Sequence, residues 1–131
     1  MKAVGKFAEK VLKTLVDGLN KVGDHRKVDN TGGAFMPVSV ECVGWCELGD
    51  LFSVAHYHEQ NGDLMRDPEM VFLRDRDGRF FPTYFLQDGG LGFEQESADV
   101  RKGTFQPAMQ AEHASFANLW MKNIREQQHL N

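Results

Sequence analysis

The sequence predicts an α+β fold, in which an antiparallel five-stranded meander sheet packs against an N-terminal and a C-terminal helix. Three observations support this class. Apolar residues recur every three or four positions at both ends of the chain, whereas the middle contains short β-rich runs. Short turn sequences separate these runs, and parallel strands would need longer crossovers. The chain of 131 residues is long enough to form one domain with its own core.

The N-terminal helix is predicted within residues 1–22. The segment AVGKFAEKVLKTLVDGLNKV (3–22) places a broad apolar stripe on one face of a helix. That stripe comprises Val4, Phe7, Ala8, Val11, Leu12, Leu15, Val16, Leu19 and Val22. Lysines occupy the opposite face. A basic amphipathic helix can also lie on an anionic membrane, but we expect a solvated face on a helix that packs against the core.

The sheet is predicted within residues 35–97, after a polar segment, GDHRKVDNTGG (23–33), that we interpret as a loop. The five expected strands are FMPVSVECV (35–43), LFSVAHYH (51–58), EMVFLR (69–74), RFFPTYFLQ (79–87) and LGFEQES (91–97). Asp77-Gly78 predicts a hairpin between the third and fourth strands. Pro82 indicates either an edge position or a bulge in the fourth strand.

The C-terminal helix is predicted within residues 105–128. Helical spacing places one set of apolar residues on a common face: Phe105, Met109, Phe116, Ala117, Leu119, Trp120 and Ile124. We expect Phe116, Trp120 and Ile124 to pack against the sheet. Leu12 and Leu15 of the N-terminal helix would pack beside them. Since no repeat or low-complexity segment interrupts this order, residues 1–131 are predicted to form a single domain.

Composition narrows the classes of function. The chain is 41% hydrophobic and 26% charged, as ordinary globular proteins are. With 15 Lys and Arg against 19 Asp and Glu, its net charge is −4, so we expect no nucleic-acid ligand. No apolar run reaches the ~20 residues that cross a bilayer, and charged residues interrupt any signal-peptide pattern. Only two cysteines occur, which argues against a disulfide scaffold. We therefore expect a cytoplasmic protein.

The segment HYHEQNGDLMRDPEM (56–70) is dense in polar groups, and we expect its part 59–68 to form a loop between the second and third strands. Asn61-Gly62 would reverse the chain, because both residues tolerate positive φ. Pro68 would begin the third strand, and at least one carboxylate is expected on Arg66, with Asp63 and Asp67 as candidates. As an architectural loop, the segment would fix the register between its strands.

The same segment is the candidate functional site. Its candidate residues are His56, His58, Glu59, Asn61, Asp63, Arg66 and Asp67. A candidate pocket beside them comprises Tyr57, Tyr84, His113 and Trp120. A histidine oriented by Glu59 or Asp63 could perform acid–base chemistry. For His113, which lies in the apolar face of the C-terminal helix, a buried histidine with one or two hydrogen bonds is the commoner outcome.

Metal and enzyme hypotheses find weaker support. Cys42, Cys46, His56 and His58 have the ligand types of a tetrahedral zinc site, but their spacing matches no common zinc motif. EF-hand numbering places Phe72 or Tyr84 where a glutamate is needed. No nucleophile elbow, phosphate-binding loop or dinucleotide motif occurs. We expect no metal, no cofactor and no enzymatic activity. The alternative is a small-ligand-binding or hydrolytic module built on residues 56–67, with or without a metal.

Three segments resemble a family of small bacterial proteins of unknown function. They are SVAHYHEQNGDLMRDPEMVF (53–72), QDGGLGFEQES (87–97) and SFANLWMKNIREQ (115–127). Members of this family are often encoded on conjugative plasmids, integrative elements and prophages. The resemblance, over about residues 35–128, implies a non-catalytic accessory role in which the chain binds another protein. It assigns no site residue, and it leaves a homodimer open.

Overall fold

The computed structural model describes residues 1–89 and 92–130 and confirms the α+β class. The two helices within these residues are α1 (Lys6–Val16) and α2 (Pro107–Gln127). Six strands pair in chain order as an antiparallel meander: β1 (His25–Val28), β2 (Val38–Cys46), β3 (Gly49–Gln60), β4 (Asp63–Asp75), β5 (Phe80–Gln87) and β6 (Phe93–Glu96). β7 (Ala98–Asp99) and β8 (Thr104–Phe105) form a separate two-stranded sheet.

Two segments that were expected to be loops contain strands. Residues 23–33 include β1, which pairs with β2 so that His25 lies opposite Glu41. The sequence did not indicate β1, because β1 is a charged edge strand in which exposed and half-buried residues alternate. Residues 59–68 are the end of a long hairpin, in which only Asn61 and Gly62 form the turn. Their φ values of 53° and 85° confirm the predicted chain reversal.

Both prolines of the sheet lie where the strand register shifts. The Asp67–Pro68 peptide is cis and lies within β4, beside a shift in the β3–β4 pairing. The expectation that Pro68 begins a strand was therefore wrong. Pro82 lies at a shift in the β4–β5 pairing, which confirms the bulge. The alternative of an edge strand was wrong, because β5 lies between β4 and β6.

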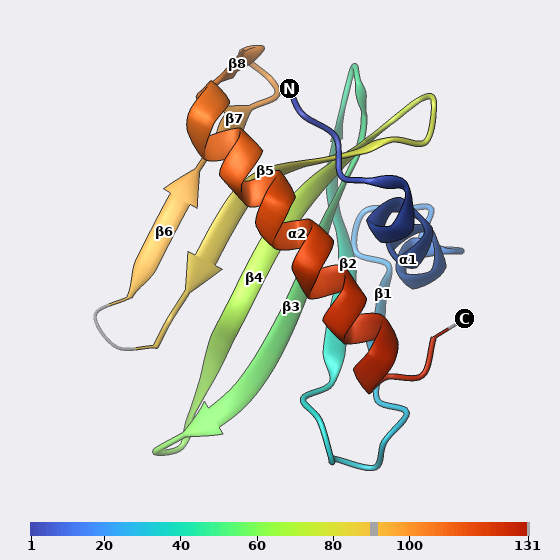
Figure 1. Ribbon diagram of the computed structural model, residues 1–131, viewed down its shortest axis with the longest axis vertical. Helices are drawn as coiled ribbons and strands as arrows, with labels where there is room; N and C mark the ends of the chain where they lie inside the picture. Colours follow the sequence, from blue (N-terminus) through green and yellow to red (C-terminus); the bar gives the residue numbers. More distant parts are fainter. Residues whose placement is uncertain (90–91, 131) are drawn as a thin grey trace.

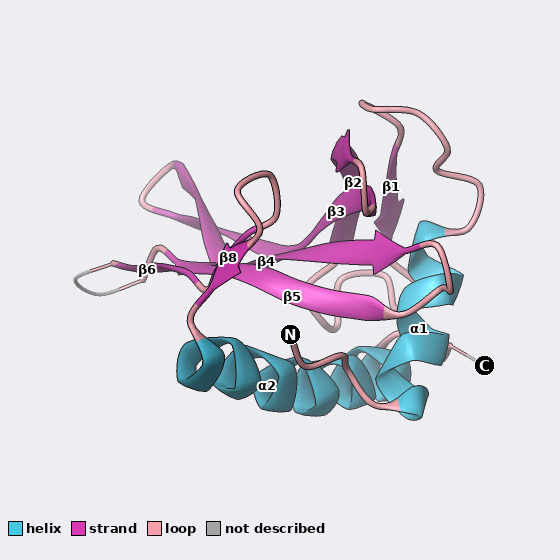
Figure 2. Ribbon diagram, turned by 90° about the horizontal axis from the view of Figure 1, so that it is seen from above, coloured by secondary structure: helices cyan, strands magenta, loops and turns pink. Residues whose placement is uncertain are grey.

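Both helices pack against the same sheet face. α2 runs obliquely across that face and α1 lies beside it, near β1 and β2 (Figures 1 and 2). Trp120, Ile124, Leu12 and Leu15 are at most 5% exposed, as expected from their spacing. Phe116 was also expected to be buried, but its side chain is 36% exposed. It lies at the margin of the interface, where its ring packs edge-on against Phe85.

The N-terminal helix is shorter than its apolar periodicity suggested. Helix α1 ends at Val16, and the chain then reverses at Gly18, where φ is 81°. The Arg26 guanidinium of β1 donates to the backbone carbonyls of Leu15 and Asp17, over 2.8 and 2.6 Å. These carbonyls would otherwise lack partners at the helix end. An arginine from the first strand thus ties the end of α1 to the sheet.

Two buried glutamines attach distant segments to α2. Gln110, 1% exposed, accepts from the Lys2 amide over 2.7 Å and donates to the Lys2 carbonyl over 2.8 Å. Gln128, just past the helix, accepts from the Asn30 amide over 2.8 Å. Because buried amide groups are costly without partners, these bonds hold the N-terminus and the β1–β2 connection in place. Within residues 1–89 and 92–130, no helix has both the length and the apolar composition to cross a membrane.

Candidate functional site

Among the residues that the structure describes, the sheet face opposite α2 carries no helix and is covered only in part, by the β7–β8 connection (Figure 2). We call it the helix-free face and define it by two rows of residues that lie opposite one another across the strands. The first row is His25, Glu41, Ser53, Val71, Tyr84 and Glu96. The second is Lys27, Ser39, Ala55, Glu69, Leu86 and Glu94. All six strands therefore contribute polar groups to one surface.

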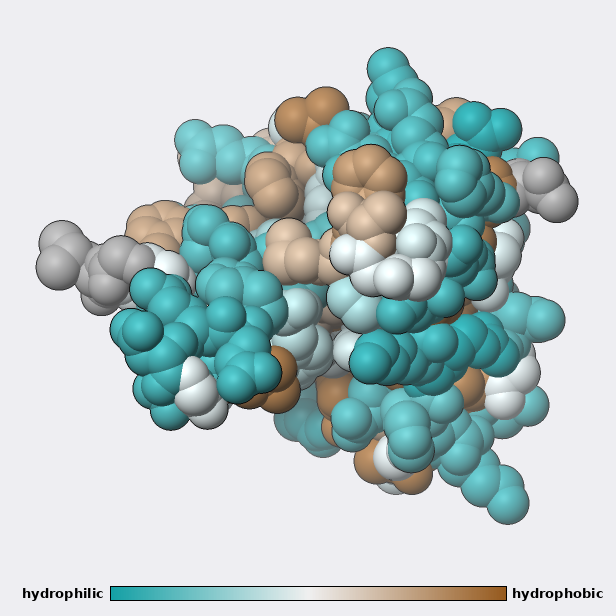
Figure 3. Space-filling model, turned by 90° about the horizontal axis from the view of Figure 1, so that it is seen from below, coloured by the Kyte–Doolittle hydropathy of each residue, from teal (hydrophilic) through white to brown (hydrophobic). Residues whose placement is uncertain are grey.

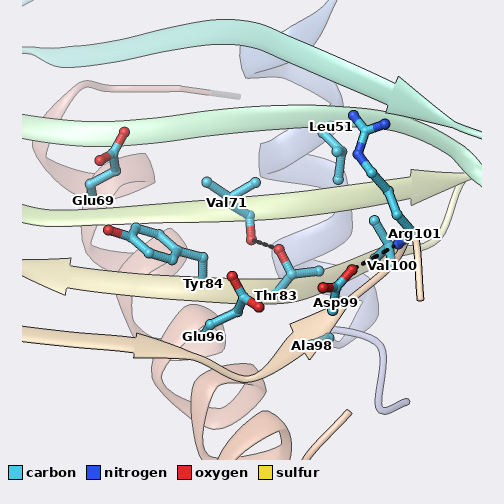
Figure 4. Close-up of a pocket in the computed structure, with 10 residues that line it drawn as sticks. All are labelled: Leu51, Glu69, Val71, Thr83, Tyr84, Glu96, Ala98, Asp99, Val100 and Arg101. Atoms are coloured by element: carbon cyan, nitrogen blue, oxygen red, sulfur yellow. Dashed lines mark hydrogen bonds between the residues drawn. The ribbon is translucent and has the colours of Figure 1, made fainter. Parts of the chain in front are cut away.

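Two hollows indent this face. One, of about 510 Å³, lies between β3–β5 and the β7–β8 connection, and the other, of about 500 Å³, lies over β1–β4. In Figure 4 the Glu69 and Tyr84 side chains lie at one end of the first hollow and Arg101 lies at the other. Thr83 donates to the Val71 carbonyl in its floor, over 3.3 Å. Since Glu69 lines both hollows, it marks the centre of the surface.

A hydrogen-bonded network fixes Glu69 in that position. Ser53 Oγ donates to Glu69 Oε2 over 2.5 Å, and Arg66 Nη1 donates to Glu69 Oε1 over 3.4 Å. Arg66 also forms a two-pronged pair with Asp88, in which Nε and Nη2 donate over 2.9 and 3.2 Å. Hydrogen bonding to Asp88 raises the pKa of Arg66, and the same bonds lower the pKa of the Asp88 carboxyl. The Arg66–Asp88 pair is thus ionised, and its hydrogen bonds order the network before any partner binds.

Carboxylates do pair with Arg66, but the expectation that Asp63 or Asp67 would supply them was wrong. They are Asp88 and Glu69, neither of which lies in residues 59–68. Asp67 instead accepts from Gln87 Nε2 over 2.6 Å, and its other oxygen lies 3.9 Å from His58 Nδ1. The remaining loop candidates Glu59, Asn61 and Asp63 are exposed at the hairpin turn. Viewed from that end, the surface is mostly hydrophilic (Figure 3).

Burial keeps the hydroxyls of the two tyrosines on the helix-free face neutral. Tyr84 donates to Glu94 Oε2 over 2.7 Å, and burial together with this bond raises the pKa of its hydroxyl well above the usual value. Burial also raises the pKa of Tyr57, and the nearby Glu69 carboxylate adds to the effect. A hydroxyl that resists ionisation is poorly suited to act as a base or nucleophile near neutral pH. Recognition by hydrogen bonding is the chemistry that suits both.

The expected pocket of Tyr57, Tyr84, His113 and Trp120 does not form, because the sheet separates its members. The tyrosines lie on the helix-free face, whereas His113 and Trp120 are buried beneath α2. His113 Nε2 donates to Gln95 Oε1 over 2.9 Å and Nδ1 accepts from Ser97 Oγ over 2.8 Å. This is the buried, hydrogen-bonded histidine that the sequence favoured. Burial lowers its pKa, so the neutral form dominates.

His56 also points to the helix side and away from its neighbours in the polar segment. Its ring meets Trp120 edge to face, with the ring centroids 5.4 Å apart. Within residues 1–89 and 92–130, neither His56 Nε2 nor Trp120 Nε1 has a hydrogen-bond partner. An N–H group directed at an aromatic face is a weak substitute for one. Burial lowers the pKa of His56, which favours its neutral form in this apolar setting.

The four metal-ligand candidates are spread along the β2–β3 hairpin. Cys42 lies opposite Phe52, Cys46 opposite Gly49, and His56 opposite Val38. Cys42 faces the core, where burial raises the pKa of its thiol. In the part of the chain that the structure describes, no group of three or more His, Cys, Asp or Glu residues could hold a metal ion. The zinc alternative therefore has no assembled site.

Sequence reasoning did not identify several residues of the helix-free face, namely Ser53, Glu69, Asp88, Glu96 and Arg101. Ser53 could have been found, because it alternates with the buried Phe52 and Val54 and must face the other way. Asp88 could not, because it lies 22 positions after its partner Arg66. Only the strand register brings those two together.

No curated protein and no solved structure matches the chain. One family model, described as a domain of unknown function, DUF6908, matches residues 6–130. This match begins at the first residue of α1 and runs past the end of α2, so it spans the helices, the sheet and the helix-free face. The chain therefore belongs to the family of domain of unknown function DUF6908.

Proposed function

We propose that the chain is a non-catalytic interaction module that binds another protein through its helix-free face. One observation carries this proposal. Polar side chains of all six strands share that face with two hollows of about 500 Å³, whereas on the helix side β2, β3 and β4 place apolar side chains such as Val40, Phe52 and Phe72 in the core. A surface of this kind, with tyrosines, an arginine and mixed charges, has the composition of a protein interface.

The internal hydrogen bonds of the face support recognition. Arg66 with Asp88, Ser53 with Glu69, and Tyr84 with Glu94 are paired in the unbound chain. Side chains that are already ordered lose less conformational entropy when a partner binds. Mixed charges contribute specificity and association rate more than affinity. We infer a partner whose charges complement those of the helix-free face.

The family resemblance supports a proposal about the cell compartment and the genetic elements in which this module acts. We propose that it acts in the bacterial cytoplasm as an accessory protein of mobile genetic elements, where its partner would be a protein of the element or of the host. This part of the proposal rests on the genetic elements that encode similar proteins, which is an association and not a physical observation. The proposed binding surface rests instead on the geometry of the sheet.

Site-specific photo-crosslinking in the producing cell tests the proposed surface. A photoreactive phenylalanine would replace Val43, which is 41% exposed and lines the hollow over β1–β4. The matched control position is Leu119, 59% exposed on α2. We expect one protein to be crosslinked from position 43 and not from position 119, as identified by mass spectrometry. The proposal fails if position 119 gives the same adduct or if position 43 gives none.

A further inference from the structure

β6 is the outermost strand of the sheet, and no described element lies beyond it (Figures 1 and 2). The Ser97 amide donates to the Thr83 carbonyl of β5 over 2.9 Å. In an antiparallel ladder, successive residues direct their amide and carbonyl groups alternately toward and away from the neighbouring strand. The backbone groups of Glu94 and Glu96 therefore point away from β5, toward solvent. They can bond to an added strand.

The two faces of β6 have different chemistry. Glu94 and Glu96 belong to the helix-free face, where Glu94 accepts from the Tyr84 hydroxyl. Phe93, on the other face, is 52% exposed and packs edge-on against Phe85, with centroids 5.9 Å apart. The exposed ring of Phe116 packs on the same phenylalanine. Hydrophobic side chains gather on this side of α2, in the upper left of Figure 3.

We infer that β6 accepts an additional strand from the partner protein, and that this strand alternates basic and apolar side chains. The inference rests on the proposed function and names its docking mode and partner class. Basic side chains would lie beside Glu94 and Glu96, as cross-strand neighbours of opposite charge stabilise a sheet. The apolar side chains would cover Phe93 and Phe116. Main-chain bonds would supply affinity and the alternating side chains specificity.

A second copy of the chain fits this edge poorly. A two-fold axis perpendicular to the sheet would pair β6 antiparallel with itself and keep both helix-free faces on one side. Glu94 would then lie opposite Glu96 of the other copy, or opposite its own equivalent. Like charges directly opposite each other destabilise a sheet, and charged edges commonly prevent self-association. The charges of β6 therefore select a basic partner strand over a second copy.

Hydrogen exchange by NMR, with defined peptides as probes, tests this directly. The first probe is a capped hexapeptide that alternates lysine and valine, and the second has the same composition with three lysines followed by three valines. We expect the alternating peptide to slow exchange at the Glu94 and Glu96 amides and to bind at least about tenfold more tightly than the block peptide. Equal binding of both peptides, or binding without this protection, would overturn the inference.

One β6 variant and a control on the same face test whether binding needs the outward backbone of β6. Glu94→Pro removes an outward amide and also the carboxylate that accepts from Tyr84, but it leaves the backbone bonds to β5 intact, because proline is tolerated at such edge positions. We expect it to lose at least about tenfold in affinity for the alternating peptide. Glu41→Gln, which removes a charge from the same face but far from β6, should stay within about twofold. Wild-type affinity in Glu94→Pro would contradict strand addition.

A charge exchange keeps the inference falsifiable if the proline variant loses its fold. In the double variant Glu94→Lys and Glu96→Lys, we expect the lysine–valine peptide to be rejected and a glutamate–valine peptide of the same alternation to bind instead. The inference of strand addition would be overturned if the double variant still preferred the lysine–valine peptide. It would also be overturned if the wild-type chain associated with itself through β6. If position 43 crosslinks a partner while every peptide fails, the proposed interaction function stands and strand addition falls.

Discussion

The two faces of the sheet are built from the same strands, yet they differ in almost every physical property. On the helix side, Phe52, Val54, Met70 and Phe72 are fully buried beneath α1 and α2. On that side His113 and Gln110 are buried with hydrogen bonds inside the protein, whereas His56 Nε2 and Trp120 Nε1 have no partner among the described residues. On the helix-free face, carboxylates, hydroxyls and an arginine surround two open hollows.

Because of this difference, neighbouring residues of one strand contribute to different properties, one to stability and the next to recognition. In β4, Phe72 is fully buried in the core, whereas its neighbour Val71 lines a hollow on the helix-free face. Burial of a large apolar side chain contributes about 1.5–3 kcal/mol, whereas exposed and half-exposed ion pairs contribute about 0–1 kcal/mol. Substitutions on the helix side should therefore lower stability, and those on the helix-free face should chiefly alter binding.

The largest effect is expected from Trp120→Ala on the helix side. The indole is 5% exposed and packs against His56 and Phe116, so its removal leaves a large cavity between α2 and the sheet. We expect a loss of about 3–5 kcal/mol in the free energy of unfolding, measured by urea titration. The control Leu119→Ala, on the exposed side of α2, should change it by less than about 0.5 kcal/mol. A loss below about 1 kcal/mol for Trp120→Ala would show that α2 does not hold the sheet.

The hairpin turn should be sensitive to backbone conformation and tolerant of charge changes. Gly62 has a φ of 85°, which a β-branched residue rarely adopts, so Gly62→Val should cost about 1–3 kcal/mol. Asp63→Asn keeps the shape of the adjacent side chain, and we expect it to change stability by less than about 0.5 kcal/mol. If Asp63→Asn left the fold intact yet abolished the photo-crosslink from position 43, residues 59–68 would have to be included in the binding surface.

Acidification should weaken the helix side first. The folded pKa values of His56 and His113 lie below the ordinary value of 6.5, because burial disfavours their charged forms. The unfolded chain then binds more protons as the pH falls below 6.5, so stability is complete above that pH and declines toward the folded pKa values. Urea titrations at about pH 7.5 and about pH 5.5 should show this loss. The carboxyl groups of Asp75 and Asp88, whose pKa values are lowered from 3.8, titrate below that window.

A double variant, His56→Phe with His113→Gln, checks the cause. Both substitutions remove a titrating ring while keeping a side chain of similar size, and the glutamine amide can still bond to Ser97 or Gln95. We expect the stability of the variant to change less between the two pH values than that of the wild type. An unchanged pH dependence would show that other groups cause the loss, and the neutral histidines would then be irrelevant to the stability of the helix side.

Hydrophobic periodicity predicted the helix side of the molecule far better than the other face. The spacing of Leu12, Leu15, Trp120 and Ile124 identified both helices and most of their buried contacts, because burial imposes a pattern on neighbouring residues. Phe116 was misplaced because periodicity gives the direction of a side chain but not the width of the sheet beneath it. β1 was missed because an exposed edge strand with charged residues carries little apolar signal.

The helix-free face could not be predicted, because it depends on register between strands distant in sequence. The candidate site was sought in residues 56–67, where polar groups are dense along the chain. Alternation in β3 instead sends His56 to one side and Tyr57 to the other, and Arg66 finds Asp88 across the sheet. The polar residues that are close together in the β3–β4 hairpin sequence thus point to different sides of the sheet. Residues far apart in the sequence, from all six strands, form the helix-free face instead.

The most direct test of the division between the two faces is the crosslink yield from position 43 in a Val71→Lys variant. Val71 lines the hollow between β3–β5 and the β7–β8 connection, on the helix-free face. A lysine there has room to extend into the hollow, so we expect the free energy of unfolding to fall by less than about 1 kcal/mol. We predict that the partner adduct is lost while the melting curve remains cooperative. An undiminished adduct, or a chain that no longer folds, would contradict the account.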